Sequence, residues 1–207
     1  MKRIMIVFAA TTIVALAGFA VYLSTVPRPG SGGVSGQVRT IGEALVGGPF
    51  TLTDHTGKRV TDDDFRGRYM LVYFGYTWCP DVCPTELQVI SAALDHLGDE
   101  AGRIRPIFVT VDPERDTVAQ MADYVANFHA SMVGLTGSPE EIATVAKAYR
   151  VYYAKAKTEG SETDYTVDHG SLIYLMDPQG KFVTHFTYST DPEKLAQGLA
   201  KAIGGGS

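Results

Sequence analysis

The sequence has few cysteines, no excess of positive charge and no internal repeat. Its 207 residues include 2 cysteines, so a structural zinc site built from cysteines alone is excluded, and zinc would need histidines or carboxylates as well. Acidic residues outnumber basic ones by 23 to 18, which indicates no nucleic-acid-binding surface. The hydrophobic fraction of 45% is sufficient for the core of one domain, with length left over for an appendage.

A long uncharged stretch lies near the N-terminus. The residues from Ile4 to Leu23 carry no formal charge and would form a helix about 30 Å long, which matches the hydrocarbon thickness of a bilayer. Lys2 and Arg3 precede it, so the N-terminus is expected in the cytoplasm and the rest of the chain on the far side. A cleaved signal peptide is the alternative, but the apolar run is longer than a signal h-region and ends in large residues. Residues 1–25 are therefore predicted to be a single-pass membrane anchor.

No Arg-rich, Ser-rich transit segment precedes this anchor, which favours a bacterial inner (cytoplasmic) membrane with the folded part in the periplasm. Residues 26–46 are rich in Pro, Gly and Ser and predict a flexible tether. The folded domain is then expected at 47–207. Without Lys2 and Arg3, the 16 remaining basic residues face 23 acidic ones, so the exported part has a net charge of −7.

Hydrophobic patterns in the domain predict strands that alternate with helices. A hairpin is expected at 50–61 and strands at 69–76, 104–112, 132–137, 171–177 and 182–188, with helices beginning near residues 83, 118, 138 and 191. The polar stretch 158–170 is expected to be a connection. This order indicates βαβ units and a sheet covered on both faces, to which the last two strands add an antiparallel edge.

Both cysteines lie in GYTWCPDVCP, residues 75–84, directly after a predicted strand. Pro84 suits the first turn of a helix, so Cys83 should lie at or beside the N-cap, where the helix dipole lowers a thiol pKa. Positions four apart on a helix have Cβ atoms about 5 to 6 Å apart, farther than a disulfide requires. The spacing of Cys79 and Cys83 therefore favours two sulfurs on one metal ion, although an irregular loop would still allow a redox disulfide.

Thiolates select soft metals, chiefly Cu(I) and zinc, and two sulfurs with one imidazole are sufficient for copper. The chain has 5 histidines. Four lie in a turn, near helix ends or inside a strand, where exposure or ordinary hydrogen bonding explains them: His55, His96, His129 and His185. His169 comes immediately before an apolar strand, in a loop that can lie close to the N-terminus of the first helix. It is the candidate third ligand beside Cys79 and Cys83.

Three motifs closely resemble the Sco/SenC family of membrane-anchored copper chaperones for cytochrome c oxidase. They are Gly-Tyr-Thr-Trp-Cys-Pro-x-x-Cys-Pro at 75–84, Val-Asp-Pro-Glu-Arg-Asp-Thr at 111–117 and Asp-His-Gly at 168–170. The resemblance covers roughly residues 47–203. It implies an α/β, thioredoxin-like fold of three layers, in which helices flank a central mixed sheet.

The resemblance also implies the function and its partners. Cys79, Cys83 and His169 would bind one copper ion per chain, Cu(I) or Cu(II), and deliver it to the Cu(A) centre of oxidase subunit II. Other periplasmic copper carriers or thiol reductases would be further partners.

Two other functions use the same residues. A thiol–disulfide oxidoreductase would use Cys79 and Cys83 as its redox pair, and a redox or copper sensor would use all three ligands. A general thioredoxin role is disfavoured, because the cysteine spacing is one residue longer than C-x-x-C and no proline occurs between Pro139 and Pro178.

Four residues of the matched motifs have open roles. Asp112 and Asp116 are expected in a turn, with Asp116 capping the helix that begins at Thr117; a role beside the metal or in docking a partner is the alternative. Tyr76 and Trp78 are either a lid over the site or aromatics of the core and rim.

Overall fold

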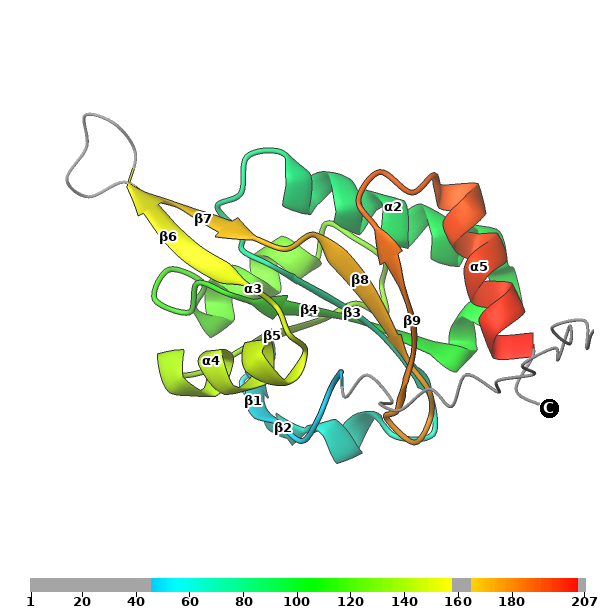
Figure 1. Ribbon diagram of the computed structural model, residues 1–207, viewed down its shortest axis with the longest axis horizontal. Helices are drawn as coiled ribbons and strands as arrows, with labels where there is room; N and C mark the ends of the chain where they lie inside the picture. The colour runs from blue at the N-terminus through cyan, green and yellow to red at the C-terminus, as the bar shows by residue number, and fades with distance from the viewer. Residues whose placement is uncertain (1–45, 158–164, 205–207) are drawn as a thin grey trace, which may run out of the picture. The chain divides into compact units, whose positions relative to one another are not determined.

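The computed structural model describes residues 46–157 and 165–204 (Figure 1). The predicted anchor at 1–25 and nearly all of the tether lie outside the described residues, so the anchor, the tether and the domain boundary at 47 stay predictions. In the part of the chain that the structure describes, no helix is both long and apolar enough to cross a bilayer.

Seven strands form one mixed sheet in the order β2-β1-β5-β4-β3-β8-β9. Their bounds are β1 Thr51–Asp54, β2 Arg59–Thr61, β3 Tyr69–Gly75, β4 Ile104–Thr110, β5 Val133–Thr136, β8 Leu172–Met176 and β9 Phe182–Thr187. The three central strands β3, β4 and β5 are parallel, whereas β1, β2, β8 and β9 pair antiparallel to their neighbours. The predicted N-terminal hairpin and the antiparallel edge are both confirmed.

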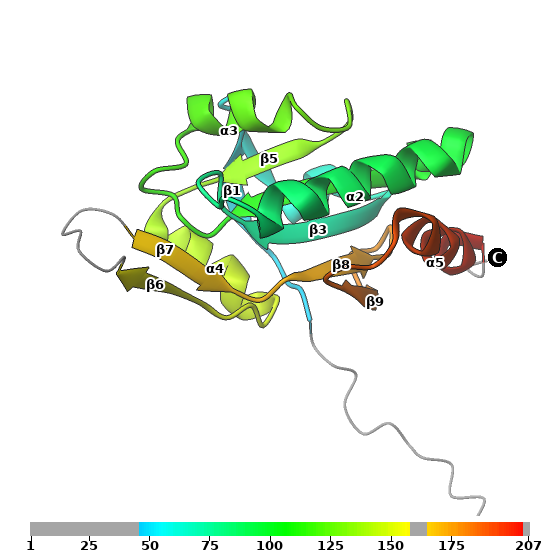
Figure 2. The same cartoon turned by 90° about the horizontal axis from the view of Figure 1, so that it is seen from above.

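Helices cover both faces of this sheet (Figure 2). They are α2 Val82–Leu97, α3 Val118–Val125, α4 Pro139–Ala148 and α5 Pro192–Gly204, with short 3-10 turns η1 Asp62–Phe65 and η2 Gly98–Arg103. Strand β3 is buried along its whole length, because its alternate side chains enter two different layers. Tyr73 stacks on Phe108 on the side of α2, and Phe74 meets Tyr149 at the end of α4 on the opposite side. The expected mixed sheet flanked by helices is confirmed.

Helix α4 begins with a capping box, close to the predicted start at residue 138. The Ser138 side chain accepts from the Glu141 N–H, and the Glu141 carboxylate accepts from the Ser138 N–H. The capping prediction for α3 was wrong, since Thr117 is the N-cap and its side chain accepts from the Gln120 N–H. Asp116 is fully buried and its oxygens are used by other donors, as described below.

A second, two-stranded sheet pairs β6 (Tyr153–Lys157) with β7 (Tyr165–His169). Figure 1 shows this hairpin extending from the body of the domain beyond the main sheet. The expectation of a plain connection at 158–170 was therefore wrong for residues 165–169, and residues 158–164 lie outside the described part of the chain. Strand β7 buries only Val167, so its sequence lacks the apolar alternation by which a strand is recognised.

Candidate metal centre

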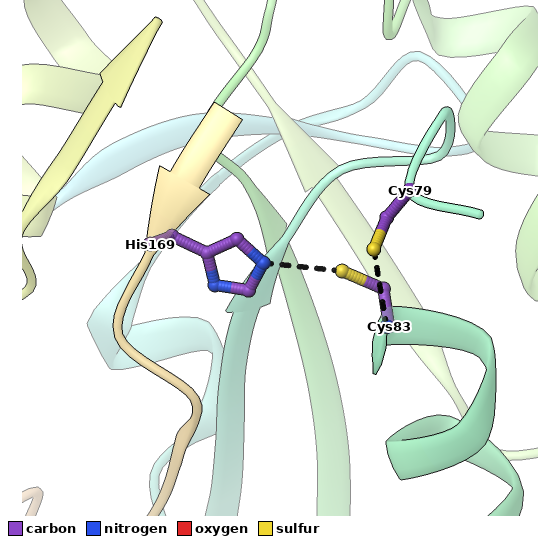
Figure 3. A group of neighbouring side chains, drawn as sticks. All are labelled: Cys79, Cys83 and His169. Carbon is purple, nitrogen blue, oxygen red and sulfur yellow. Dashed lines mark hydrogen bonds between the residues drawn. The ribbon is translucent and has the colours of Figure 1, made fainter. Parts of the chain in front are cut away.

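Cys79, Cys83 and His169 come together from three different parts of the domain (Figure 3). Cys79 lies in the loop after β3, Cys83 is the second residue of α2, and His169 is the last residue of β7. The Cys83 Sγ lies 3.3 Å from the His169 Nε2, and the donor atoms all lie within 4.8 Å of one another. Over the described ranges, this is the one cluster of three or more Cys, His or acidic side chains arranged to hold a metal ion.

The local fold around the cysteines follows from the two prolines. Pro84 occupies the first turn of α2, where no intrahelical N–H is required, and Pro80 lies in the irregular turn before the helix. This turn brings the Cys79 Sγ within 3.4 Å of the Cys83 backbone N–H, which donates to it. Both thiols are free, with Cys83 buried and Cys79 half-buried.

The two sulfurs differ in charge. The pKa of Cys79 is lowered to about 3, because its thiolate accepts from the Cys83 thiol and further from the backbone N–H groups of Cys83 and Asp81. The pKa of Cys83 is raised, because the neighbouring thiolate holds its proton and because the side chain is buried. The expectation that the helix N-terminus lowers the pKa of Cys83 was wrong, since the nearby negative charge and burial outweigh the dipole.

His169 presents Nε2 to the sulfurs. Its Nδ1 lies 3.2 Å from the carbonyl oxygen of Gly170, an acceptor, so Nδ1 carries the proton and Nε2 keeps its lone pair. The imidazole lies edge-on to two tyrosine rings, with centroids 6.3 Å from Tyr73 and 5.9 Å from Tyr76. Tyr76 is thus a buried wall of the site, whereas Trp78 is 61% exposed beside Cys79.

Gly75 is a residue that the sequence reasoning missed. A Cβ at this position would lie 2.7 Å from the Cys83 Sγ and 2.9 Å from the Phe108 ring, so a side chain there would displace the thiol. The one available signal was a glycine at the end of an otherwise large, apolar strand.

The other four histidines do not belong to this cluster. His55 and His129, expected to be exposed, are half-buried, and their Nδ1 atoms accept from the N–H groups of Gly134 and Ser131. His96 is exposed, as expected. His185, expected to be half-buried, is exposed on β9 and stacks on Phe182.

Asp116 and Asp112 lie next to the site without belonging to the cluster. Asp116 accepts from the N–H of Thr77 at 2.9 Å and from its hydroxyl at 2.7 Å. Thr77 lies two residues before Cys79. Asp112 accepts from the hydroxyl of Tyr165 at 2.8 Å, and Tyr165 lies four residues before His169. Both carboxylates thus bind segments that carry a candidate ligand.

The chain is similar to proteins of one known family. The SCO1/SenC family model matches residues 38–204. The mitochondrial SCO1 homolog 1 of Arabidopsis thaliana is 48% identical over 163 residues, which are 78% of this chain and 48% of that protein. The chain therefore spans about half the length of this relative.

Two solved structures with copper bound have the same fold. ScoI of Arabidopsis thaliana is 46% identical with a TM-score of 0.73, over 77% of this chain and 99% of the solved one. ScoI of Bradyrhizobium japonicum is 49% identical with a TM-score of 0.70, over 76% and 99%. The fold is thus the thioredoxin-like Sco fold. The two sulfurs and one imidazole of the candidate site suit one copper ion. The chain belongs to the SCO1/SenC family, a family of cytochrome c oxidase assembly proteins.

Proposed function

We propose that this protein is a membrane-anchored copper chaperone that delivers one copper ion to the Cu(A) centre of cytochrome c oxidase subunit II. Cys79, Cys83 and His169 hold the ion. The observation that carries the proposal is the convergence of three soft or borderline donors, within 4.8 Å, in a family with copper-bound structures. The proposal places the anchor in a bacterial inner membrane and the folded domain in the periplasm, on the basis of residues 1–25.

Delivery proceeds by ligand exchange between docked proteins. The thiolate of Cys79 is half-exposed, so the partner's incoming thiolates and imidazoles reach this side of the copper first. Cys83 is buried and is replaced last, and it regains its proton as the ion leaves. A membrane anchor would raise the local concentration of the chaperone near a membrane-bound oxidase.

The ligand set is tested by copper content and visible absorption of the purified protein. Cys79→Ser, Cys83→Ser and His169→Ala should each abolish tight copper binding and the thiolate-to-Cu(II) absorption band. His55→Ala and His129→Ala are matched controls and should retain both. Tight, stoichiometric copper in His169→Ala would remove the third ligand from the proposal.

Delivery is tested separately, by mixing the copper-loaded protein with a purified copper-free Cu(A) domain of subunit II. The Cu(A) absorption should develop as the chaperone loses copper. A copper sensor would bind copper with the same ligands but would leave the acceptor empty.

A second function, thiol–disulfide exchange, is favoured by the half-exposed Cys79 thiolate beside a protonated Cys83. Cys79 would attack one sulfur of a substrate disulfide and form a mixed disulfide, releasing the other sulfur as a thiol. Cys83 would then lose its proton and displace the substrate, so that the cysteine pair is oxidised by two electrons. Disulfide reduction by the copper-free protein that is unchanged in His169→Ala would favour this function over delivery.

A further inference from the structure

The hairpin that carries His169 is not part of the main sheet. Among the described strands, β6 and β7 hydrogen-bond only to each other. An isolated two-stranded hairpin is marginally stable in water, so strand pairing alone cannot hold the imidazole at the cysteines. Contacts from elsewhere in the domain must set the position of His169.

The loop from β4 to α3 supplies these contacts through Arg115. The Arg115 Nη1 donates to the Tyr165 carbonyl oxygen at 3.1 Å, and its guanidinium carbon lies 3.8 Å from the centroid of the Tyr165 ring. Its Nε donates to Asp112, which is fully buried and accepts from the Tyr165 hydroxyl. Tyr165 and His169 lie four residues apart on β7 and so point to the same face of the hairpin.

The same guanidinium reaches the cysteine loop. Its carbon lies 5.7 Å from the centroid of Tyr76 and 5.8 Å from that of Trp78, the residue before Cys79. The next residue in the chain, Asp116, accepts from the Thr77 N–H and hydroxyl. One short segment therefore contacts the strand that carries His169 and the loop that carries Cys79.

We propose that Arg115 is a positioning residue for copper binding, which clamps the β6–β7 hairpin against the cysteine loop and thereby holds the His169 Nε2 at the two sulfurs. This inference rests on the proposed copper site. Arginine is suited to the task because its planar fork donates in two directions while its face stacks on an aromatic ring.

The test compares Arg115→Met with the wild-type full-length chain. Methionine keeps an unbranched apolar stem but removes the hydrogen bonds and the cation. The Cu(I) affinity, measured by competition with a chelator, should fall about 10- to 100-fold, the range for lost support of a metal ligand. In the Cu(II) form, the nitrogen hyperfine coupling of the imidazole should weaken or disappear from the electron paramagnetic resonance spectrum. Arg59→Met, which removes an exposed arginine paired with Glu141, is the control and should change neither result.

A double-mutant cycle separates positioning from a general structural role. If Arg115 acts through His169, then Arg115→Met should lower the affinity of the His169→Ala variant less than about twofold. An equal loss in both backgrounds would overturn the proposal, and so would wild-type affinity in Arg115→Met. Arg115→Lys keeps the charge without the planar fork, so its copper affinity should lie between those of the wild type and Arg115→Met. It supplies a milder variant if methionine impairs folding.

Hydrogen exchange of the copper-free protein gives a result that does not depend on the copper function. Arg115→Met should speed exchange of the β6 and β7 amides and leave those of β3 protected. Unchanged exchange in the hairpin would overturn the clamp. Faster exchange in the hairpin, together with wild-type copper affinity in His169→Ala, would instead show that the clamp exists and that the proposed ligand set is wrong.

Discussion

The single proton between Cys79 and Cys83 governs the chemistry of the site. Half-buried Cys79 is charged because the thiol and the backbone N–H of Cys83 donate to it, and buried Cys83 stays protonated because it faces that charge. The His169 Nε2 has its lone pair free because Nδ1 donates to Gly170. Two of the three ligands are therefore ready for a metal ion before it arrives.

Copper binding should accordingly release about one proton, from Cys83, at pH 7 to 8. Because the metal displaces this proton, the apparent affinity should rise about tenfold for each pH unit as long as the free Cys83 is protonated. Anaerobic calorimetry in buffers of different ionisation enthalpy measures the number of protons released. A value near two would mean that Cys79 is also a thiol in the free protein and would contradict the charge assignment.

The space beside the Cys83 Sγ leaves no room for a side chain at position 75. Gly75→Ala should lower the free energy of unfolding by about 1 to 3 kcal/mol, because the new methyl group overlaps the Cys83 Sγ and Phe108. Copper affinity should fall as well, since the thiol is pushed from its place. Gly170→Ala, next to His169, is the matched control, because a Cβ there meets nothing within 4 Å. Urea unfolding checks stability, and equal stability of the two variants would refute the crowding argument.

At the scale of elements, the cysteine loop depends on a hydrogen bond to the segment after β4. Thr77→Val removes the hydroxyl that donates to the fully buried Asp116 but keeps the shape of the side chain. We expect a loss of about 1 to 3 kcal/mol in the free energy of unfolding, because one carboxylate oxygen is left without its donor. Amides of the loop around Cys79 should exchange faster in the variant.

Thr144→Val provides the comparison for this experiment. The Thr144 hydroxyl donates to the Glu140 carbonyl oxygen on the exposed surface of α4, where water can replace it. Its stability should change by less than about 0.5 kcal/mol. A similar change in the free energy of unfolding in both variants would show that the hydrogen bond from Thr77 to Asp116 stabilises the fold no more than an exposed one.

Elements with a strong apolar period were predictable, and those held by polar contacts were not. β3 is buried throughout and α2 has apolar residues at helical spacing, so local pattern was sufficient for both. β7 is held by Tyr165, whose partners Asp112 and Arg115 lie about 50 residues earlier. The cap of α3 was assigned to Asp116 because aspartate is a good cap, but that side chain is used by Thr77 and Thr110.

For the whole molecule, a metal ion at this site would join segments that are distant in the chain. Cys83 and His169 are 86 positions apart, so the site exists only in the folded state. Copper should therefore raise the free energy of unfolding by about 2.7 kcal/mol when the free ion is at 100 times its dissociation constant. Thermal unfolding with and without copper measures this, and His169→Ala should show a smaller increase. The absence of any shift in the wild type would mean that copper also binds the unfolded chain or does not bind the folded one.

The sequence by itself determined the donor types, the chain order of the elements with a clear apolar pattern, and the family resemblance, because these depend on residue type and local spacing. It also singled out His169 among the histidines by its place before an apolar strand. Only the tertiary structure decided which cysteine carries the charge, why Gly75 has no side chain, and how Arg115 and Asp112 hold the hairpin. Those properties depend on burial and on contacts between segments far apart in the chain, which local spacing does not encode.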